Sequence, residues 1–198
     1  MKNALLVIDM QKDFCPGGAL AVTGGDEIVA GINAAMFTSD LVVLTQDWHP
    51  EDHLSLAPNH PGKSSFETVD MPYGPQILWP AHCLIGSEGA AFHDDLDLSR
   101  ADLILRKGSN PKIDSYSAFF ENDKETKTGL EGYLRDHGVE AVTLMGLAQD
   151  FCVAWSAVDA ARLGLDTSVA LDLTRAIDTD GSKEAALANM RAAGVTFI

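Results

Sequence analysis

The stretch Glu140-Ala-Val-Thr-Leu-Met-Gly-Leu-Ala-Gln-Asp-Phe-Cys152 decides the fold class, because it joins a buried strand to a helix. Its first half, Glu140 to Met145, is typical of a strand buried on both faces. The segment that follows, Val153–Leu163, has a helical pattern that ends at Gly164. A strand that leads into a helix is the repeating unit of α/β proteins, so the stretch predicts a largely parallel sheet.

The same alternation of strand and helix extends along the chain in both directions. Strands are expected at Ala4–Asp9, Asp40–Thr45, Asp102–Arg106, Ala141–Met145, Thr167–Leu171 and Val195–Ile198. Further helices are expected at Asp26–Phe37, Thr128–His137 and Ser182–Ala193. The alternation therefore supports an α/β fold along nearly the whole chain.

The composition is that of one globular domain. The chain has 198 residues, of which 46 % are hydrophobic, enough for a full core. We expect a single domain over residues 1–198, with an irregular insert at about 46–100 that is rich in proline, histidine and tryptophan. Long irregular inserts in compact domains are usually functional, which directs attention to this segment.

Charge and cysteine usage narrow the function classes. The formal net charge of −15 argues against nucleic acid and membrane surfaces as partners, because both are anionic. No signal-peptide pattern and no apolar run of about 20 residues is found in the sequence. Three irregularly spaced cysteines favour free thiols and a cytoplasmic location. The sequence leaves open whether the chain forms homo-oligomers.

Three candidate catalytic residues follow the ends of expected strands, where open parallel sheets bind their ligands. Cys152 would lie in the first turn of a helix, where the dipole favours a thiolate and backbone N–H groups can hold an oxyanion. Asp9 could accept the thiol proton, with a pKa raised by partial burial. Lys107 could hold both charges in place. The alternatives are a packing cysteine, a capping carboxylate and a solvated lysine.

A metal site is predicted in the irregular insert. Asp47, His49 and His53 form the pattern D-x-H-x3-H, and His82 follows further on. One carboxylate with three imidazoles suits zinc, iron(II) or manganese(II). His60 competes with His53 for a place in this set, and the spacing does not decide between them.

Four aromatic residues accompany these groups and could form a stacking slot for a flat ring, although each could equally be a packing residue. They are Phe14, Trp79, Tyr116 and Phe151.

Five motifs, in order along the chain, resemble the nicotinamidase/pyrazinamidase family of isochorismatase-like cysteine hydrolases. They are Ile8-Asp-Met-Gln-Lys-Asp-Phe14, Asp47-Trp-His49, Trp79-Pro-Ala-His-Cys83, Lys107-Gly108 and Gly146-Leu-Ala-Gln-Asp-Phe-Cys152. The resemblance implies a three-layer sandwich in which helices flank a six-stranded, mainly parallel sheet. It also implies hydrolysis of nicotinamide to nicotinic acid and ammonia through a cysteine thioester, in NAD salvage, with pyrazinamide as a further substrate.

The resemblance also assigns residue roles. It implies Cys152 as nucleophile, Asp9 as proton acceptor and Lys107 as the third catalytic member. It implies a divalent metal ion, usually zinc or iron, on Asp47, His49, His53 and His82, and a pyridine ring between Phe14 and Trp79 with Tyr116 nearby. The oxyanion hole would map to the backbone N–H groups of Ala148 and Cys152, and a non-proline cis peptide to the bond between Ala148 and Gln149.

The chain departs from some relatives at two positions beside the nucleophile, Gln149 and Phe151, where threonine and histidine also occur. The insert at 56–76 is longer than in the shortest relatives. Three other functions remain as alternatives: hydrolysis of a carbamoyl or ureido amide, hydrolysis of a vinyl ether, and metal or ligand binding without turnover. The metal cluster argues against the first, Cys152 against the second, and the conjunction of Asp9, Lys107 and Cys152 against the third.

Overall fold

The computed structural model describes residues 2–198, and its centre is a six-stranded sheet. The strand order is β5-β2-β1-β6-β7-β8, and every neighbouring pair in it is parallel. This confirms the expected α/β class and the six-stranded parallel sheet. The strands are β1 (Lys2–Ile8), β2 (Val42–Asp47), β5 (Leu103–Lys107), β6 (Val139–Leu147), β7 (Asp166–Arg175) and β8 (Thr196–Phe197).

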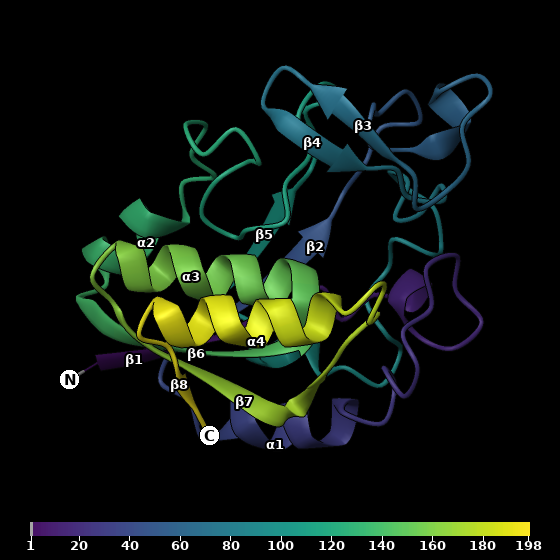
Figure 1. Cartoon of the computed structure of the whole chain (residues 1–198). Helices are drawn as coiled ribbons and strands as arrows, with labels where there is room; N and C mark the ends of the chain where they lie inside the picture. Colours follow the sequence, from purple (N-terminus) through teal and green to yellow (C-terminus); the bar gives the residue numbers. More distant parts are fainter. Residues whose placement is uncertain (1) are drawn as a thin grey trace.

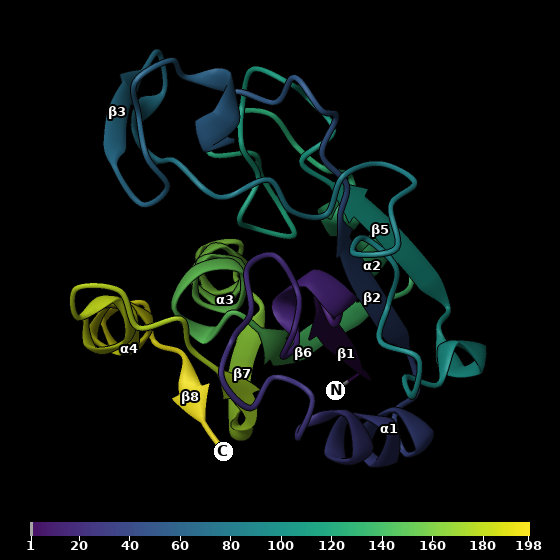
Figure 2. The same cartoon turned by 90° about the vertical axis from the view of Figure 1, so that its right-hand side faces the viewer.

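Helices cover both faces of this sheet. One face carries α1 (Val29–Phe37), and the other carries α2 (Leu130–Asp136), α3 (Ala154–Arg162) and α4 (Ser182–Ala192) (Figures 1 and 2). The resulting three layers are the predicted sandwich. None of the helices in the described part of the chain is long and apolar enough to cross a membrane.

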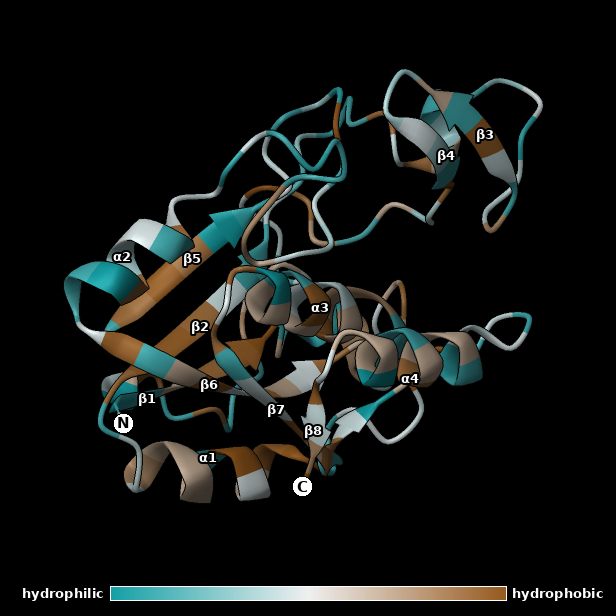
Figure 3. Ribbon diagram, turned by 60° about the vertical axis from the view of Figure 1, so that its left-hand side comes forward, coloured by the Kyte–Doolittle hydropathy of each residue, from teal (hydrophilic) through white to brown (hydrophobic). Residues whose placement is uncertain are grey.

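Hydropathy explains why the central strands are central. From Ala4 to Ile8, β1 is buried throughout, and β2 is buried along its whole length, because both lie between two helical layers. These strands are among the most hydrophobic parts of the ribbon (Figure 3). By contrast, β5 lies at the sheet edge, and alternate residues such as Ile104 and Arg106 are exposed. Polar residues at the ends of β1 and β2, such as Asp9 and Asp47, are therefore unusual in this buried environment and indicate a functional role.

The structure adds three features that the sequence pattern did not predict. The insert contains an antiparallel hairpin, β3 (Thr68–Met71) and β4 (Gly74–Ile77), which stands apart from the main sheet (Figure 1). Short 3₁₀ turns occur at Lys12–Phe14, Ala57–Asn59 and Leu98–Arg100. Between β6 and α3 the chain forms a π-helical turn, Gln149–Val153, in place of a first α-helical turn.

Candidate active site and metal centre

Four neighbouring strands, β5, β2, β1 and β6, bring the predicted catalytic groups to one edge of the sheet. Asp47 and Lys107 are the last residues of β2 and β5, and Asp9 directly follows β1. Cys152 lies in the turn after β6. Because parallel strands end at the same edge, side chains from distant parts of the sequence meet there.

The lysine is the centre of the charged cluster. Lys107 Nζ lies 2.8 Å from Asp9 Oδ2 and 3.5 Å from Cys152 Sγ, and it donates to the carbonyl oxygen of Ser115 at 2.9 Å. It also forms an ion pair with Asp47. The contact to Asp47 was not predicted, and it joins the three catalytic candidates directly to the predicted metal ligands.

The two buried carboxylates, Asp9 and Asp47, differ in their affinity for a proton. Burial raises the pKa of Asp9 above its ordinary value of 3.8, although Lys107 opposes this shift. Burial alone would also raise the pKa of Asp47, but Lys107 and His49 together hold it well below that range. Two carboxylates on one lysine therefore have separated affinities for a proton, the arrangement expected of an acid–base site.

The thiol differs from the expectation of a low-pKa thiolate at a helix N-terminus. Burial raises the pKa of Cys152 well above its ordinary value, and the carboxylates of Asp9 and Asp47 add to this effect against Lys107. The resting group is therefore a thiol beside a carboxylate of raised proton affinity. Thr45 Oγ1 donates to Asp9 Oδ1 at 2.6 Å and accepts from the Asp9 backbone N–H. Thr45, in β2, therefore fixes the orientation of this carboxylate, whose Oδ2 faces Lys107.

The turn that carries the thiol corrects one detail of the sequence analysis. The non-proline cis peptide joins Leu147 and Ala148, one bond earlier than expected. Ala148 and Cys152, whose backbone N–H groups were expected to form the oxyanion hole, both line the same cavity.

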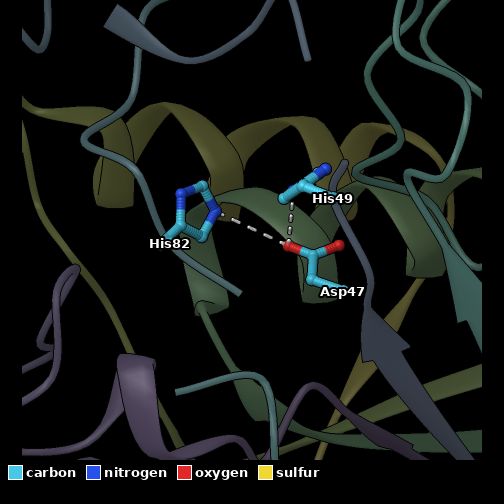
Figure 4. Close-up of side chains that lie close together, drawn as sticks. All are labelled: Asp47, His49 and His82. Carbon is cyan, nitrogen blue, oxygen red and sulfur yellow. Dashed lines mark ion pairs between the residues drawn. The ribbon is translucent and has the colours of Figure 1, made fainter. Parts of the chain in front are cut away.

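Two histidines present their Nε2 atoms to Asp47. His49 Nδ1 lies 2.9 Å from the carbonyl oxygen of Gly108, and His82 Nδ1 lies 2.8 Å from that of Pro80. A carbonyl can only accept, so each Nδ1 carries a hydrogen and each Nε2 is the ring nitrogen that faces the carboxylate. The two Nε2 atoms lie 3.6 and 3.8 Å from Asp47 Oδ2 (Figure 4). Asp47, His49 and His82 form a set that could hold a metal ion.

His53, the fourth predicted ligand, has a different hydrogen-bond pattern. Its Nδ1 lies 2.8 Å from the hydroxyl oxygen of Ser55 and 3.1 Å from the backbone nitrogen of the same residue. Burial, with His49 nearby, lowers the pKa of His53 to about 4, so the ring is neutral near pH 7. Its Nε2 is buried and has no hydrogen-bond partner among the described residues. His53 therefore remains a predicted ligand, and it belongs to a group of residues that could hold a metal ion.

Asp114 is a site residue that the sequence analysis missed. It is buried, and its carboxylate forms a second group of metal-binding type with His49 and His53. It follows the strand end at Lys107 by seven positions in an irregular loop. The only sequence signal was an acid shortly after the Lys-Gly motif, and loop acids are too common for that signal to be specific.

The four aromatic candidates lie in one place. Phe14, Trp79, Tyr116 and Phe151 all line the cavity that contains Cys152, Asp47, His49 and His82. Trp79 and Phe151 meet edge to face, with ring centroids 4.8 Å apart. An aromatic-walled cavity with a few polar groups at one end suits a flat ring that carries a polar substituent. Leu20, Asp114 and Ile177 complete the lining and were not predicted.

His60, His137 and the groove between α3 and α4 lie outside the cavity that contains Cys152. His60 Nε2 bonds to the carbonyl oxygen of Leu54, which favours His53 over His60 beside the metal site. His137 Nδ1 bonds to the carbonyl oxygen of Tyr133 at the end of α2. A larger groove between α3 and α4, lined by residues such as Trp155 and Ala186, contains none of the predicted groups.

Comparison with known proteins identifies the family of this chain. A family profile described as "Isochorismatase domain" matches residues 3–198, and the chain belongs to that family. Within it, a nicotinamidase of Acinetobacter baylyi is 52 % identical over 195 residues, covering 98 % of this chain and 91 % of the relative.

Two solved structures show the same fold. A nicotinamidase/pyrazinamidase of Acinetobacter baumanii has a TM-score of 0.98 at 50 % identity, covering 100 % of this chain and 95 % of the other. A pyrazinamidase of Pyrococcus horikoshii, solved in complex with zinc, has a TM-score of 0.80 at 33 % identity, covering 100 % of this chain and 99 % of the other.

Proposed function

We propose that this chain is an amidohydrolase that converts nicotinamide to nicotinic acid and ammonia, and that it also hydrolyses pyrazinamide. The observation that carries the proposal is the placement of Cys152 Sγ 3.5 Å from Lys107 Nζ, which in turn lies 2.8 Å from Asp9. The aromatic cavity and the names of the relatives identify the substrate class. The reaction returns the pyridine ring to NAD salvage.

In the proposed mechanism, the thiol of Cys152 loses its proton to Asp9 as Sγ attacks the carboxamide carbon. The raised pKa of Asp9 suits it to this role, because the carboxylate must hold the proton until the next step. The charge that develops on the carbonyl oxygen is taken up by the backbone N–H groups of Ala148 and Cys152. One such donor contributes about 3–4 kcal/mol in comparable sites.

The second half of the reaction reuses the same groups. Asp9 returns its proton to the departing nitrogen, the C–N bond breaks, and ammonia leaves a thioester on Cys152. Water then attacks the thioester, forming nicotinic acid and restoring the thiol. Lys107 remains charged throughout, because its contacts with Asp47 and Asp9 outweigh its burial and raise its pKa well above the ordinary value.

A divalent ion is the proposed cofactor, with zinc or iron(II) favoured and manganese(II) as an alternative. The residues fit such an ion: Asp47, His49, His53 and His82 would hold it, with Asp114 beside them. The buried Nε2 of His53 supports this fit, since it has no hydrogen-bond partner among the described residues and is free to bind an ion. When bound, the ion would polarise a ring nitrogen or a water molecule.

Two further proposals concern setting and organisation. We place the protein in the cytoplasm, because all three cysteines are free in the described part of the chain. We also propose that residues 1–198 form one domain, which the extent of the family match supports.

An ammonia-release assay with nicotinamide tests the function. We expect turnover by the wild-type protein and none by Cys152→Ala, while the metal content of the two proteins is the same. Turnover by Cys152→Ala would remove the nucleophile assignment, and a wild-type protein without turnover would remove the function. A carbamoyl amide assayed in parallel tests the alternative within the same family.

A further inference from the structure

The β3–β4 hairpin has no role in the mechanism above, yet it contributes an unusual side chain. Among the residues of its two strands, all of which the structure describes, Gln76 alone is buried, with 1 % of its surface exposed. Its neighbours are exposed or half-buried, as expected of a hairpin outside the main sheet. A buried amide costs free energy unless it is hydrogen-bonded, so its partners indicate why it is there.

Two of the hydrogen-bond partners of Gln76, Asp114 and Tyr116, line the active-site cavity. Its Nε2 donates to Asp114 Oδ2 at 2.8 Å and to the Tyr116 hydroxyl at 2.9 Å, and the carbonyl oxygen of Ile77 lies 2.7 Å away. Its Oε1 accepts from the Tyr73 hydroxyl at 3.2 Å. The carboxylate of Asp114 can only accept, which fixes the orientation of the amide.

A second amide closes the network on the other side. Asn122 Nδ2 donates to Gln76 Oε1 at 3.3 Å, and Asn122 Oδ1 accepts from the backbone N–H of Tyr116 at 3.0 Å. The Tyr116 hydroxyl also accepts from Trp79 Nε1 at 3.0 Å. The amide oxygen of Gln76 is thus fixed by Tyr73 and Asn122, and its nitrogen bonds to Asp114 and Tyr116, which line the cavity.

From these contacts we propose that Gln76 is a positioning residue, which orients Asp114 beside the ion site and Tyr116 in the ring slot at the same time. Gln76 does not line the cavity, so it acts through these two residues. The part of the inference that concerns Tyr116 and substrate binding rests on the proposed function. It makes the hairpin a part of the active site that lies more than 70 residues from Cys152 in the sequence.

Asp114 and Tyr116 differ in how much their orientation depends on Gln76. Without it, Asp114 keeps a hydrogen bond from the backbone N–H of Ser115 to Oδ1 but loses its donor at Oδ2. Tyr116 keeps its bond from Trp79. We therefore expect the larger effect on ion binding and a smaller one on substrate binding.

The experiment compares Gln76→Met with Tyr73→Phe, using protein loaded with zinc and titrated with a chelator. Met has a similar length but no donor, and we expect zinc affinity to fall about tenfold or more, as for other residues that orient metal-site groups. The KM for nicotinamide should rise more than kcat falls. Tyr73→Phe removes a donor to Oε1 but leaves both Nε2 bonds intact, so zinc affinity and KM should stay near the wild-type values.

A double variant separates positioning from general packing. If Gln76 acts on the ion through Asp114, Gln76→Met should weaken zinc binding much less in an Asp114→Asn background, while its effect on KM persists. Gln76→Glu serves where Gln76→Met folds poorly. It keeps the shape, and as a carboxylate facing Asp114 it should weaken zinc binding at least as much.

The zinc titration and the KM measurement can each contradict the positioning role of Gln76. Wild-type zinc affinity and KM in a folded Gln76 variant would overturn the proposal, and so would equal losses in Gln76→Met and Tyr73→Phe. If the wild-type protein releases no ammonia, the proposed function fails, but the zinc titration still tests the link from Gln76 to Asp114.

Discussion

At the scale of the residue, the site depends on one buried lysine placed between two carboxylates of different proton affinity. Lys107 contacts Asp9, Asp47 and Cys152, so no one of these charges is isolated in the buried site. Removing Lys107 would leave two buried carboxylates without their shared cation, which is costly. The charged cluster is therefore expected to respond as a unit to mutation and to pH.

The first prediction concerns pH. Attack by the thiol requires Asp9 in its deprotonated form, and burial raises its pKa above 3.8. Lowering the pH through that raised pKa protonates the base, so kcat/KM should fall on the acid side at a pH clearly above 3.8. A profile of kcat/KM against pH measures this. An acid limb at or below the ordinary aspartate value would contradict the role given to burial.

The second prediction concerns Gly108, whose φ is +71°. A Cβ there would lie 2.5 Å from Cε1 of His49, closer than carbon atoms approach. Gly108→Ala should displace the imidazole and lower zinc occupancy and turnover about tenfold or more.

Gly62→Ala is the matched control, because Gly62 has a φ of +81° but no atom within 4 Å of its added Cβ. Both variants carry the backbone strain of a left-handed alanine, about 1 kcal/mol. Only the variant at 108 should lose zinc. Equal zinc contents in the two proteins would show that the contact with His49 is not what requires glycine.

At the scale of the element, the turn Gln149–Val153 places the nucleophile, and Asp150 anchors that turn. The buried carboxylate of Asp150 accepts from the backbone N–H groups of Ile177 and Asp178, at 3.1 and 2.8 Å, and from the hydroxyl of Ser182. These contacts tie the turn before α3 to the start of α4. The position of Cys152 thus depends on a segment about 25 residues further along the chain.

The third prediction is that Asp150→Ala lowers the free energy of unfolding by about 2 kcal/mol or more, because it leaves buried donors without an acceptor. Asp97→Ala is the control, since exposed Asp97 accepts a comparable pair of bonds from Ser99 and its loss should cost about 1 kcal/mol. Denaturant unfolding of both variants gives the comparison. Equal losses would mean that the anchor adds nothing beyond an ordinary cap.

At the scale of the whole molecule, the ion site links strands and insert into one structure. Asp47 ends β2, whereas His53 and His82 lie in the insert and Asp114 lies in the loop after β5. A ligand that binds only the folded state stabilises it by mass action, by about 2.7 kcal/mol at 100 times its Kd. The ion should therefore contribute to stability as well as to turnover.

The fourth prediction is that a chelator lowers the Tm of the wild-type protein and of Cys152→Ala by similar amounts. His49→Ala should show a lower Tm at the start and little further change with the chelator, because a ligand to the ion is already missing. Thermal unfolding with and without added zinc measures this. A fully zinc-loaded His49→Ala protein with the wild-type Tm would remove His49 from the ligand set.

The amino-acid sequence by itself determined the α/β class, the places of the six strands and the residue types at their ends. Buried strands and amphipathic helices leave periodic patterns, so Ala4–Asp9 and Asp40–Thr45 could be recognised to within about two residues. Asp9, Lys107 and Cys152 could be selected because each lies at or shortly after the end of an expected strand, where open parallel sheets bind their ligands. Their roles remain predictions that the experiments above test.

Only the tertiary structure decided which loop residues meet. The contacts of Gln76 with Asp114 and Tyr116, and of Trp79 with Tyr116, depend on the path of irregular segments. That path carries no period in the sequence, because each of its hydrogen bonds joins groups whose separation along the chain is arbitrary. The sheet edge could be inferred from local patterns, but the hydrogen-bond network above it exists only once distant segments have packed together.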